Sequence, residues 1–195
     1  MSKTYLYIDG QNFLARIRTI LRRGGEAETD ITKFDFWGLL NHIFKDEKVD
    51  LATIYFAKLH AEERTKEKSE ELILREAALK ERLEQQGIRY VTGGAVRTRV
   101  RGEEVSFEEK GVDVKIAVDM LVDAIDQHVD TIIVGSSDSD LQPVVAALKA
   151  RKVKVIYLGF QARRNRGLAA TTDRTVLISN EDVQRFYPKN GVQHG

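Results

Sequence analysis

The stretch YLYIDGQN at positions 5–12 places an aspartate, Asp9, directly after a short run of aromatic and β-branched residues. Such a run is typical of a buried β-strand. The arrangement recurs in VDTIIVGSSDSDL at 129–141, where Asp138 and Asp140 follow an apolar run that ends in glycine. A carboxylate at the end of a buried strand needs a compensating partner, because burial disfavours its charged form. These acids are therefore the first candidates for a functional site.

A third segment, EKGVDVKIAVDML at 109–121, places Asp113 at the start of a nearly all-apolar helical pattern. Asp119 lies inside the same pattern, four residues after Lys115. Residues four apart share a helix face, so we expect a Lys115–Asp119 ion pair and a supporting, structural role for Asp119. Direct contact of Asp119 with a metal ion is the minority alternative.

Short β-branched or aromatic runs recur along the whole chain, with helical patterns between most of them. They occupy residues 4–8, 50–57, 88–93, 130–135, 153–159 and 174–179. Near-continuous apolar strands that alternate with helices, such as 11–23 and 34–45, indicate a parallel sheet covered on both faces. The sequence predicts an α/β fold that forms one domain over residues 1–187, followed by a flexible tail at 188–195.

Two segments depart from this alternation. Residues 61–86 carry opposite charges at helical spacing with a narrow leucine seam, which predicts a long solvent-exposed helix. The alternative is an arm that binds a protein partner or a second copy of the chain. Residues 93–110 alternate around an Arg-Gly-Glu turn and predict a hairpin. Its Arg97, Arg99 and Arg101 share one face, either to contact RNA phosphates or to pair with the glutamates opposite.

Composition excludes several classes of site. The chain has 31 Lys and Arg against 30 Asp and Glu, so its net charge of +1 provides no global attraction for nucleic acid. Without cysteine it has no disulfide, thiolate-bound zinc or cysteine nucleophile. No P-loop, GxGxxG or GxSxG motif occurs. No apolar run approaches the roughly 20 residues that span a bilayer, and no signal segment opens the chain, so we expect a cytoplasmic protein.

Ligands in open α/β sheets bind beyond the carboxyl ends of the strands, where the strand order reverses. If the strands that precede Asp9 and Asp138 are neighbours there, the two acids converge, and Asp113 completes the group. Like charges this close require neutralisation, and hard oxygen ligands favour Mg²⁺ or Mn²⁺. Helix capping is the alternative role for Asp138 and Asp140, and Asn12 either caps the first helix or contacts a water or phosphate.

Three segments together resemble the NYN domain, a branch of the PIN-like nucleases, and within it the LabA-like proteins. They are YIDGQN (7–12), KGVDVKIAVDML (110–121) and GSSDSDLQPVV (135–145). The resemblance implies a three-layer α/β/α PIN-like (Rossmann-like) domain that hydrolyses RNA phosphodiester bonds with Mg²⁺ or Mn²⁺, as an endoribonuclease.

The resemblance also assigns roles to single residues. It implies metal ligation by Asp9, Asp113, Asp138 and Asp140, with Asp119 as a further candidate and Asn12 as the polar companion of the first acid. Cations for the RNA backbone are expected from the loop QARRNRG at 161–167, through Arg163, Arg164 and Arg166, although a solvated basic loop explains them equally well.

Two other functions compete with the nuclease. The first is a domain of the same fold that binds RNA or a protein without cleaving it, since fold alone does not fix function. The second is a phosphatase with an aspartyl nucleophile after the first strand. Gln11 opposes that reading, because such enzymes usually carry a second acid at this position.

Overall fold

The computed structural model describes residues 2–26, 29–58, 66–101 and 104–188; it describes residues 66–70, 95–101 and 104–110 through their backbone. The strands are β1 (Thr4–Asp9), β2 (Leu51–Lys58), β3 (Arg89–Arg101), β4 (Glu104–Lys110), β5 (Thr131–Gly135), β6 (Lys154–Phe160) and β7 (Arg174–Ile178). The α-helices are α1 (Gly10–Arg23), α2 (Phe36–Ile43), α3 (Lys66–Gln85), α4 (Val112–Asp126), α5 (Gln142–Ala150), α6 (Arg166–Thr171) and α7 (Asn180–Arg185). Short 3-10 helices are η1 (Ile31–Lys33), η3 (Ser139–Leu141) and η4 (Gln161–Arg163).

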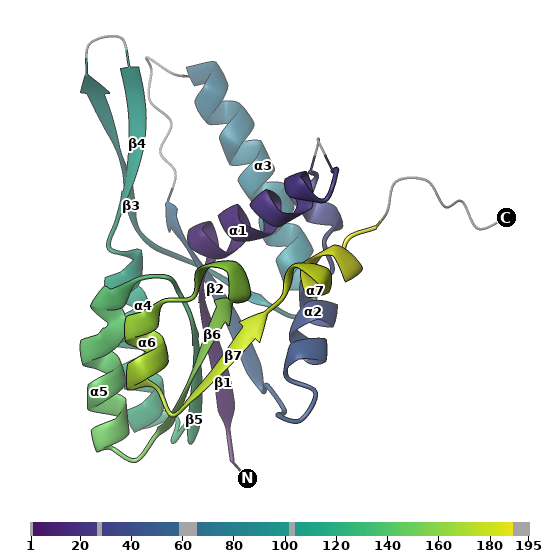
Figure 1. Cartoon of the computed structure of the whole chain (residues 1–195). Helices are drawn as coiled ribbons and strands as arrows, with labels where there is room; N and C mark the ends of the chain where they lie inside the picture. The colour runs from purple at the N-terminus through teal and green to yellow at the C-terminus, as the bar shows by residue number, and fades with distance from the viewer. Residues whose placement is uncertain (1, 27–28, 59–65, 102–103, 189–195) are drawn as a thin grey trace, which may run out of the picture.

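The strands form one sheet in the order β4-β3-β2-β1-β5-β6-β7 (Figure 1). Neighbouring strands are parallel, except that β3 and β4 pair antiparallel. The strand order reverses at β1, because β2 and β3 follow on one side and β5 to β7 on the other. β1 and β5 are neighbours, with Ile8 beside Gly135. The predicted α/β fold with a mainly parallel sheet is confirmed.

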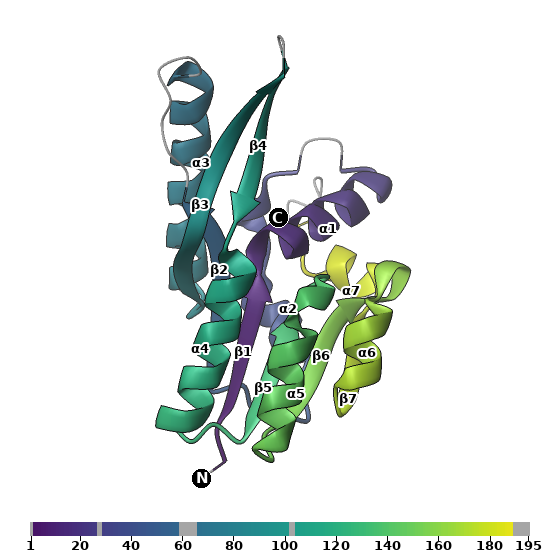
Figure 2. The ribbon, with the colours of Figure 1, turned by 90° about the vertical axis from the view of Figure 1, so that its left-hand side faces the viewer.

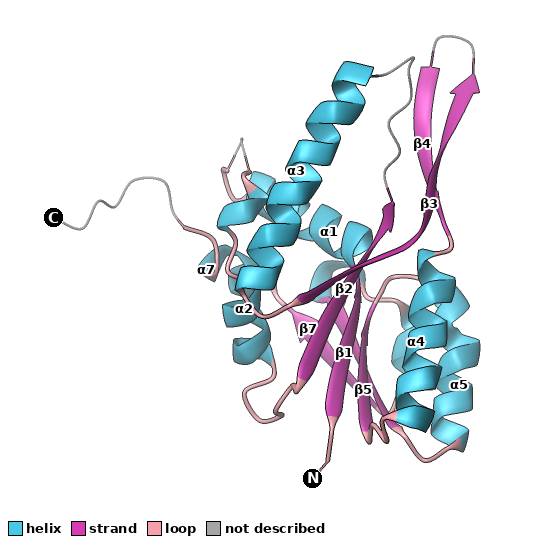
Figure 3. Cartoon of the chain, turned by 180° about the vertical axis from the view of Figure 1, so that it is seen from behind, coloured by secondary structure: helices cyan, strands magenta, loops and turns pink. Residues whose placement is uncertain are grey.

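Helices cover both faces of the sheet and give a three-layer α/β/α domain (Figures 2 and 3). The core beneath α1, α2, α3 and α7 receives Leu6 and Ile8 from β1, whereas Tyr7 enters the core beneath α4, α5 and α6. Every residue of β5 is buried, because both of its faces are covered. The loops at the carboxyl edge therefore extend from strands that are packed on both faces.

Local sequence explains where the helices begin. Asp9 is the N-cap of α1, and Asp35 is the N-cap of α2, where its carboxylate accepts a hydrogen bond from the Gly38 amide at 2.8 Å. The observed helix α2 is therefore shorter at both ends than the helix predicted at 34–45. Asp30 caps η1, with its carboxylate accepting from the Thr32 amide.

The long helix predicted from the charged segment is observed as α3, and most of its described side chains are exposed; the part of its leucine seam nearest the C-terminus packs against the core. Leu79 and Leu83 are buried in the core shared with α1 and α2, whereas Leu74 is 71% exposed. Residues 61–65 of the predicted helix lie outside the described residues, as do residues 189–195 of the predicted tail. None of the described helices combines the length and apolar character needed to span a membrane.

We predict that Leu83→Ala lowers the free energy of unfolding by about 2–5 kcal/mol, because it leaves a cavity where α3 meets the core. Leu74→Ala makes the same change on the exposed face of the same helix, and we expect an effect within about 0.5 kcal/mol. Urea unfolding followed by circular dichroism measures both. Equal effects of the two substitutions would show that α3 is not held through Leu83.

Candidate metal centre

Three aspartates meet at the carboxyl edge of the sheet. One side-chain oxygen from each of Asp113, Asp138 and Asp140 lies within 4.8 Å of the other two. Asp113 lies in the first turn of α4, whereas Asp138 and Asp140 belong to the turn that follows β5. We call these three residues the acidic cluster. Each was a candidate metal ligand from sequence, and the structure brings them together.

Two glycines place Asp113 at this edge. Gly111 has a φ of 88°, in the left-handed region that favours glycine, and it turns the chain from β4 into α4. A Cβ on Gly93 of β3 would lie 2.7 Å from the side chain of Lys115. Because Gly93 has no side chain, α4 packs close to β3, and its first turn lies at the end of the sheet.

A network within the turn after β5 orients Asp138. The Asp138 amide donates to the hydroxyl of Ser136 at 3.0 Å, and Ser136 is only 6% exposed. The Asp138 carboxylate, through Oδ1, accepts from the Asp140 amide at 2.9 Å and so caps η3. Capping and cluster membership are thus compatible, because a carboxylate has two oxygens. Pro143 follows in the first turn of α5, where a missing amide proton is tolerated.

Asp9 lies beside this group but is not one of its three members. Its Oδ1 accepts from the Asn12 amide at 3.1 Å, and its Oδ2 accepts from the Asn12 side chain at 2.5 Å. Burial raises the pKa of Asp9, and the charge of Asp138 adds to this rise, while the bonds from Asn12 oppose it. Asp9 is therefore electrostatically coupled to the cluster.

The cap of the first helix is Asp9, which corrects the capping role considered for Asn12. α1 begins at Gly10, one residue earlier than expected, so the N-cap position falls on Asp9. Asn12 instead holds the Asp9 carboxylate in place, because its backbone amide and its side-chain amide each donate a hydrogen bond to it.

Asp119 faces the sheet rather than the cluster. Its Oδ1 pairs with Lys115 at 2.6 Å, as predicted, and its Oδ2 accepts from the hydroxyl of Tyr55 at 3.0 Å. One turn further along α4, Asp123 accepts from the hydroxyl of Tyr7 at 2.7 Å. Burial, together with the acid beside it, raises the pKa of each tyrosine, so both remain protonated donors. These two bonds fix α4 on β1 and β2.

The acidic cluster fits a divalent metal ion. In the part of the chain that the structure describes, no Lys, Arg or His forms an ion pair with Asp113, Asp138 or Asp140. Asp113 and Asp138 are partly buried, which makes their mutual repulsion costly without a neutralising charge. Carboxylate oxygens are the ligands that Mg²⁺ and Mn²⁺ prefer.

The sequence matches the NYN domain family over residues 3–179. The chain belongs to the NYN domain family. NYN domains are PIN-like nucleases, which generally depend on divalent metal ions. Among curated protein sequences there is no match. Among solved structures, the chain is similar to VPA0982, a protein of unknown function from Vibrio parahaemolyticus. The two are 23% identical, the match covers 91% of this chain and 93% of that chain, and the TM-score is 0.53. This likeness shows the shared fold.

The predicted RNA-binding arginines of the NYN domain occupy two places. Arg163 and Arg164 follow β6 and line a pocket beside the acidic cluster, whereas Arg166 in α6 is not among its lining residues. The other three predicted residues lie on β3, and their side chains lie outside what the structure describes; they are Arg97, Arg99 and Arg101.

Sequence reasoning missed two residues of this region. Arg16 of α1 lines the same pocket, and Asn165 links two loops. Arg16 gives no sequence signal, because an arginine on the polar side of an amphipathic helix is ordinary. Asn165 precedes a short helix and could have been recognised as its N-cap.

We predict that two aspartate substitutions change the stability of the metal-free NYN domain to different extents. Asp119→Ala leaves Tyr55 and Lys115 without their partner and should lower the free energy of unfolding by about 1–3 kcal/mol. Asp138→Asn keeps the cap but removes one like charge, and should stay within about 0.5 kcal/mol of the wild type or exceed it.

Urea unfolding in EDTA measures both, and a second series with Mn²⁺ measures metal binding as added stability. We expect Mn²⁺ to stabilise the wild type more than Asp138→Asn. A clear loss of stability in Asp138→Asn without metal would contradict the repulsion argued here.

Proposed function

We propose that this NYN domain is a metal-dependent endoribonuclease of the LabA-like branch, which hydrolyses RNA phosphodiester bonds with Mg²⁺ or Mn²⁺ held by the acidic cluster. The observation that carries the proposal is the convergence of Asp113, Asp138 and Asp140 at the edge where β1 and β5 end, without a cationic partner among the described residues. The LabA-like assignment rests on the three segments YIDGQN, KGVDVKIAVDML and GSSDSDLQPVV.

The side chains divide the work as follows. Asp113, Asp138 and Asp140 would hold the ion. Asp9 is oriented by Asn12 and coupled to Asp138. It would either stay protonated beside the three acids or act as a further ligand of the ion. When bound, the ion supplies positive charge beside the attacked phosphate and makes a water molecule more acidic.

The substrate backbone carries negative charge, and the acidic cluster alone would repel it. Arg163 and Arg164 lie on the same edge of the sheet and are exposed. Their guanidinium groups match phosphate oxygens in geometry and charge, so they would bring an RNA strand toward the cluster.

We predict that the purified protein cleaves RNA with Mn²⁺ or Mg²⁺ and not with EDTA. Asp138→Asn should reduce the cleavage rate at least about 100-fold, because even indirect supports of a metal site are worth about 10–100-fold. Asp9→Asn should also reduce it. Asp126→Asn is the matched control: it removes an exposed aspartate from the far end of α4 and should leave the rate unchanged. Gel analysis of single-stranded and structured RNAs measures the rates.

Two experimental outcomes would favour a function other than a nuclease. Metal-independent RNA binding by a folded protein that cleaves none of the RNAs would favour a regulatory binding module. Release of phosphate from small esters without action on RNA would favour the phosphatase. Circularised RNA separates endonucleolytic from exonucleolytic action, because it has no end.

A further inference from the structure

A pocket of about 410 Å³ adjoins the acidic cluster. Asn12, which is bonded to Asp9, lines one part of it, and Ser136 and Ser137, which lead into Asp138, line another. The remaining wall comes from α1 and from the loop after β6. The volume lies within the roughly 300–1,000 Å³ that small-molecule sites occupy. The pocket is therefore large enough for a small ligand.

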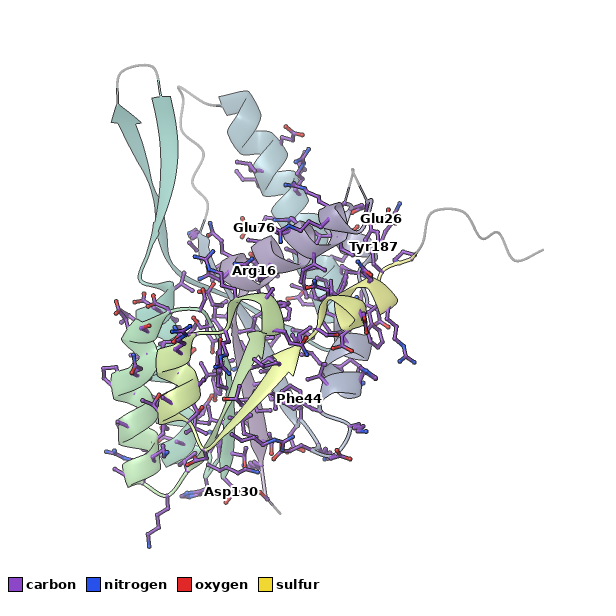
Figure 4. All side chains as sticks on the ribbon, viewed as in Figure 1. Arg16, Glu26, Phe44, Glu76, Asp130 and Tyr187 are labelled. Carbon is purple, nitrogen blue, oxygen red and sulfur yellow. The ribbon has the colours of Figure 1, made fainter. Side chains whose placement is uncertain are left out.

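Three guanidinium groups surround this pocket. Arg16 extends from α1, and Arg163 and Arg164 come from the loop after β6. Among the described residues, no carboxylate pairs with any of them. Figure 4 labels Arg16 near the carboxyl edge of the sheet, opposite the edge that Asp130 marks. Three like charges without a carboxylate partner favour an anionic ligand.

Apolar surface completes the pocket. Phe13 and Phe160 line it, and their ring centroids lie 5.2 Å apart. Both are almost fully buried, so their rings are fixed by the core behind them. A ligand with an anionic end and a flat apolar part would match both kinds of wall.

Asn165 holds the cationic loop against the acidic turn. Its side-chain amide donates to the carbonyl of Ser137 at 2.8 Å and to the hydroxyl of Ser139 at 3.0 Å. The backbone amide of Asn165 donates to the hydroxyl of Tyr157 at 2.8 Å. Arg163 and Arg164 are thus attached to the turn that carries Asp138, which sets the spacing between pocket and cluster.

We propose that this pocket is a subsite for one nucleoside monophosphate unit, with its phosphate among Arg16, Arg163 and Arg164 and its base or sugar on the wall formed by Phe13 and Phe160. The inference rests on the proposed function for the source of this unit, which is the RNA nucleotide next to the cleaved bond. A free nucleoside monophosphate has the same chemistry and would occupy the same site.

We predict that 5′-AMP binds the wild-type protein in EDTA, and that Arg16→Gln weakens this binding about 10-fold or more, since a charged hydrogen bond contributes about that factor. Adenosine, which lacks the phosphate, should bind more weakly than 5′-AMP. Arg23→Gln is the matched control, because it makes the same change at an exposed position of the same helix outside the pocket. Isothermal titration calorimetry measures the affinity of the wild type for 5′-AMP and adenosine, and the affinity of both variants for 5′-AMP.

A second variant, Arg163→Gln, is compared with the same Arg23→Gln control, so the test remains valid if Arg16→Gln misfolds. Equal affinity for 5′-AMP in each variant and its control, or no binding by the wild type, would overturn the subsite.

A third measurement uses a short labelled RNA in EDTA. Weakened RNA binding in Arg16→Gln together with competition by 5′-AMP identifies the strand as the source, whereas unchanged RNA binding identifies a free-nucleotide site. These binding measurements do not require RNA hydrolysis. The absence of RNA cleavage therefore bears on the proposed function, and the absence of 5′-AMP binding bears on the pocket.

Discussion

The parallel pairing of β1 with β5 is the constraint on which the site depends. It aligns Ile8 with Gly135, so the chain leaves both strands at the same edge, at the point where strand order reverses. Asp9 is the last residue of β1, and Asp138 lies three residues beyond the end of β5. Their convergence is thus a product of sheet topology, and the repulsion between them is built into the fold.

Rigid supports hold these charges in place against that repulsion. Asn12 occupies both oxygens of Asp9, and Ser136 anchors the backbone of Asp138. α4 carries Asp113 and is attached to the sheet by the buried hydroxyls of Tyr7 and Tyr55. These bonds form within the protein alone. The carboxylates are therefore oriented by their neighbours in the protein, as expected of residues that would hold a metal ion.

The sequence predicted what depends on local pattern, and failed where the outcome depended on distant contacts. The strand runs and their apolar continuity were sufficient for the α/β fold, and the spacing of Lys115 and Asp119 was sufficient for their ion pair. The leucine seam of α3 was recognised from the sequence, but its spacing did not show which end packs on the core: Leu83 is buried, whereas Leu72 is 39% exposed. The cap of α1 was misplaced for a different reason, since Asp9 is both the last residue of β1 and the N-cap of α1.

The nearly balanced charge of the whole chain conceals a local separation of charge. Ser136 and Ser137 line the arginine pocket and lead into Asp138, and Asn165 links the loop of Arg163 and Arg164 to this turn. An anionic ligand that approached the cluster alone would be repelled. Beside the arginines it would be attracted, and in the proposed subsite the link through Asn165 would determine how far its phosphate lies from the acids. In this proposal the arginines bind the anionic ligand and the aspartates hold the metal ion, and the two groups come from different segments at one edge of the sheet.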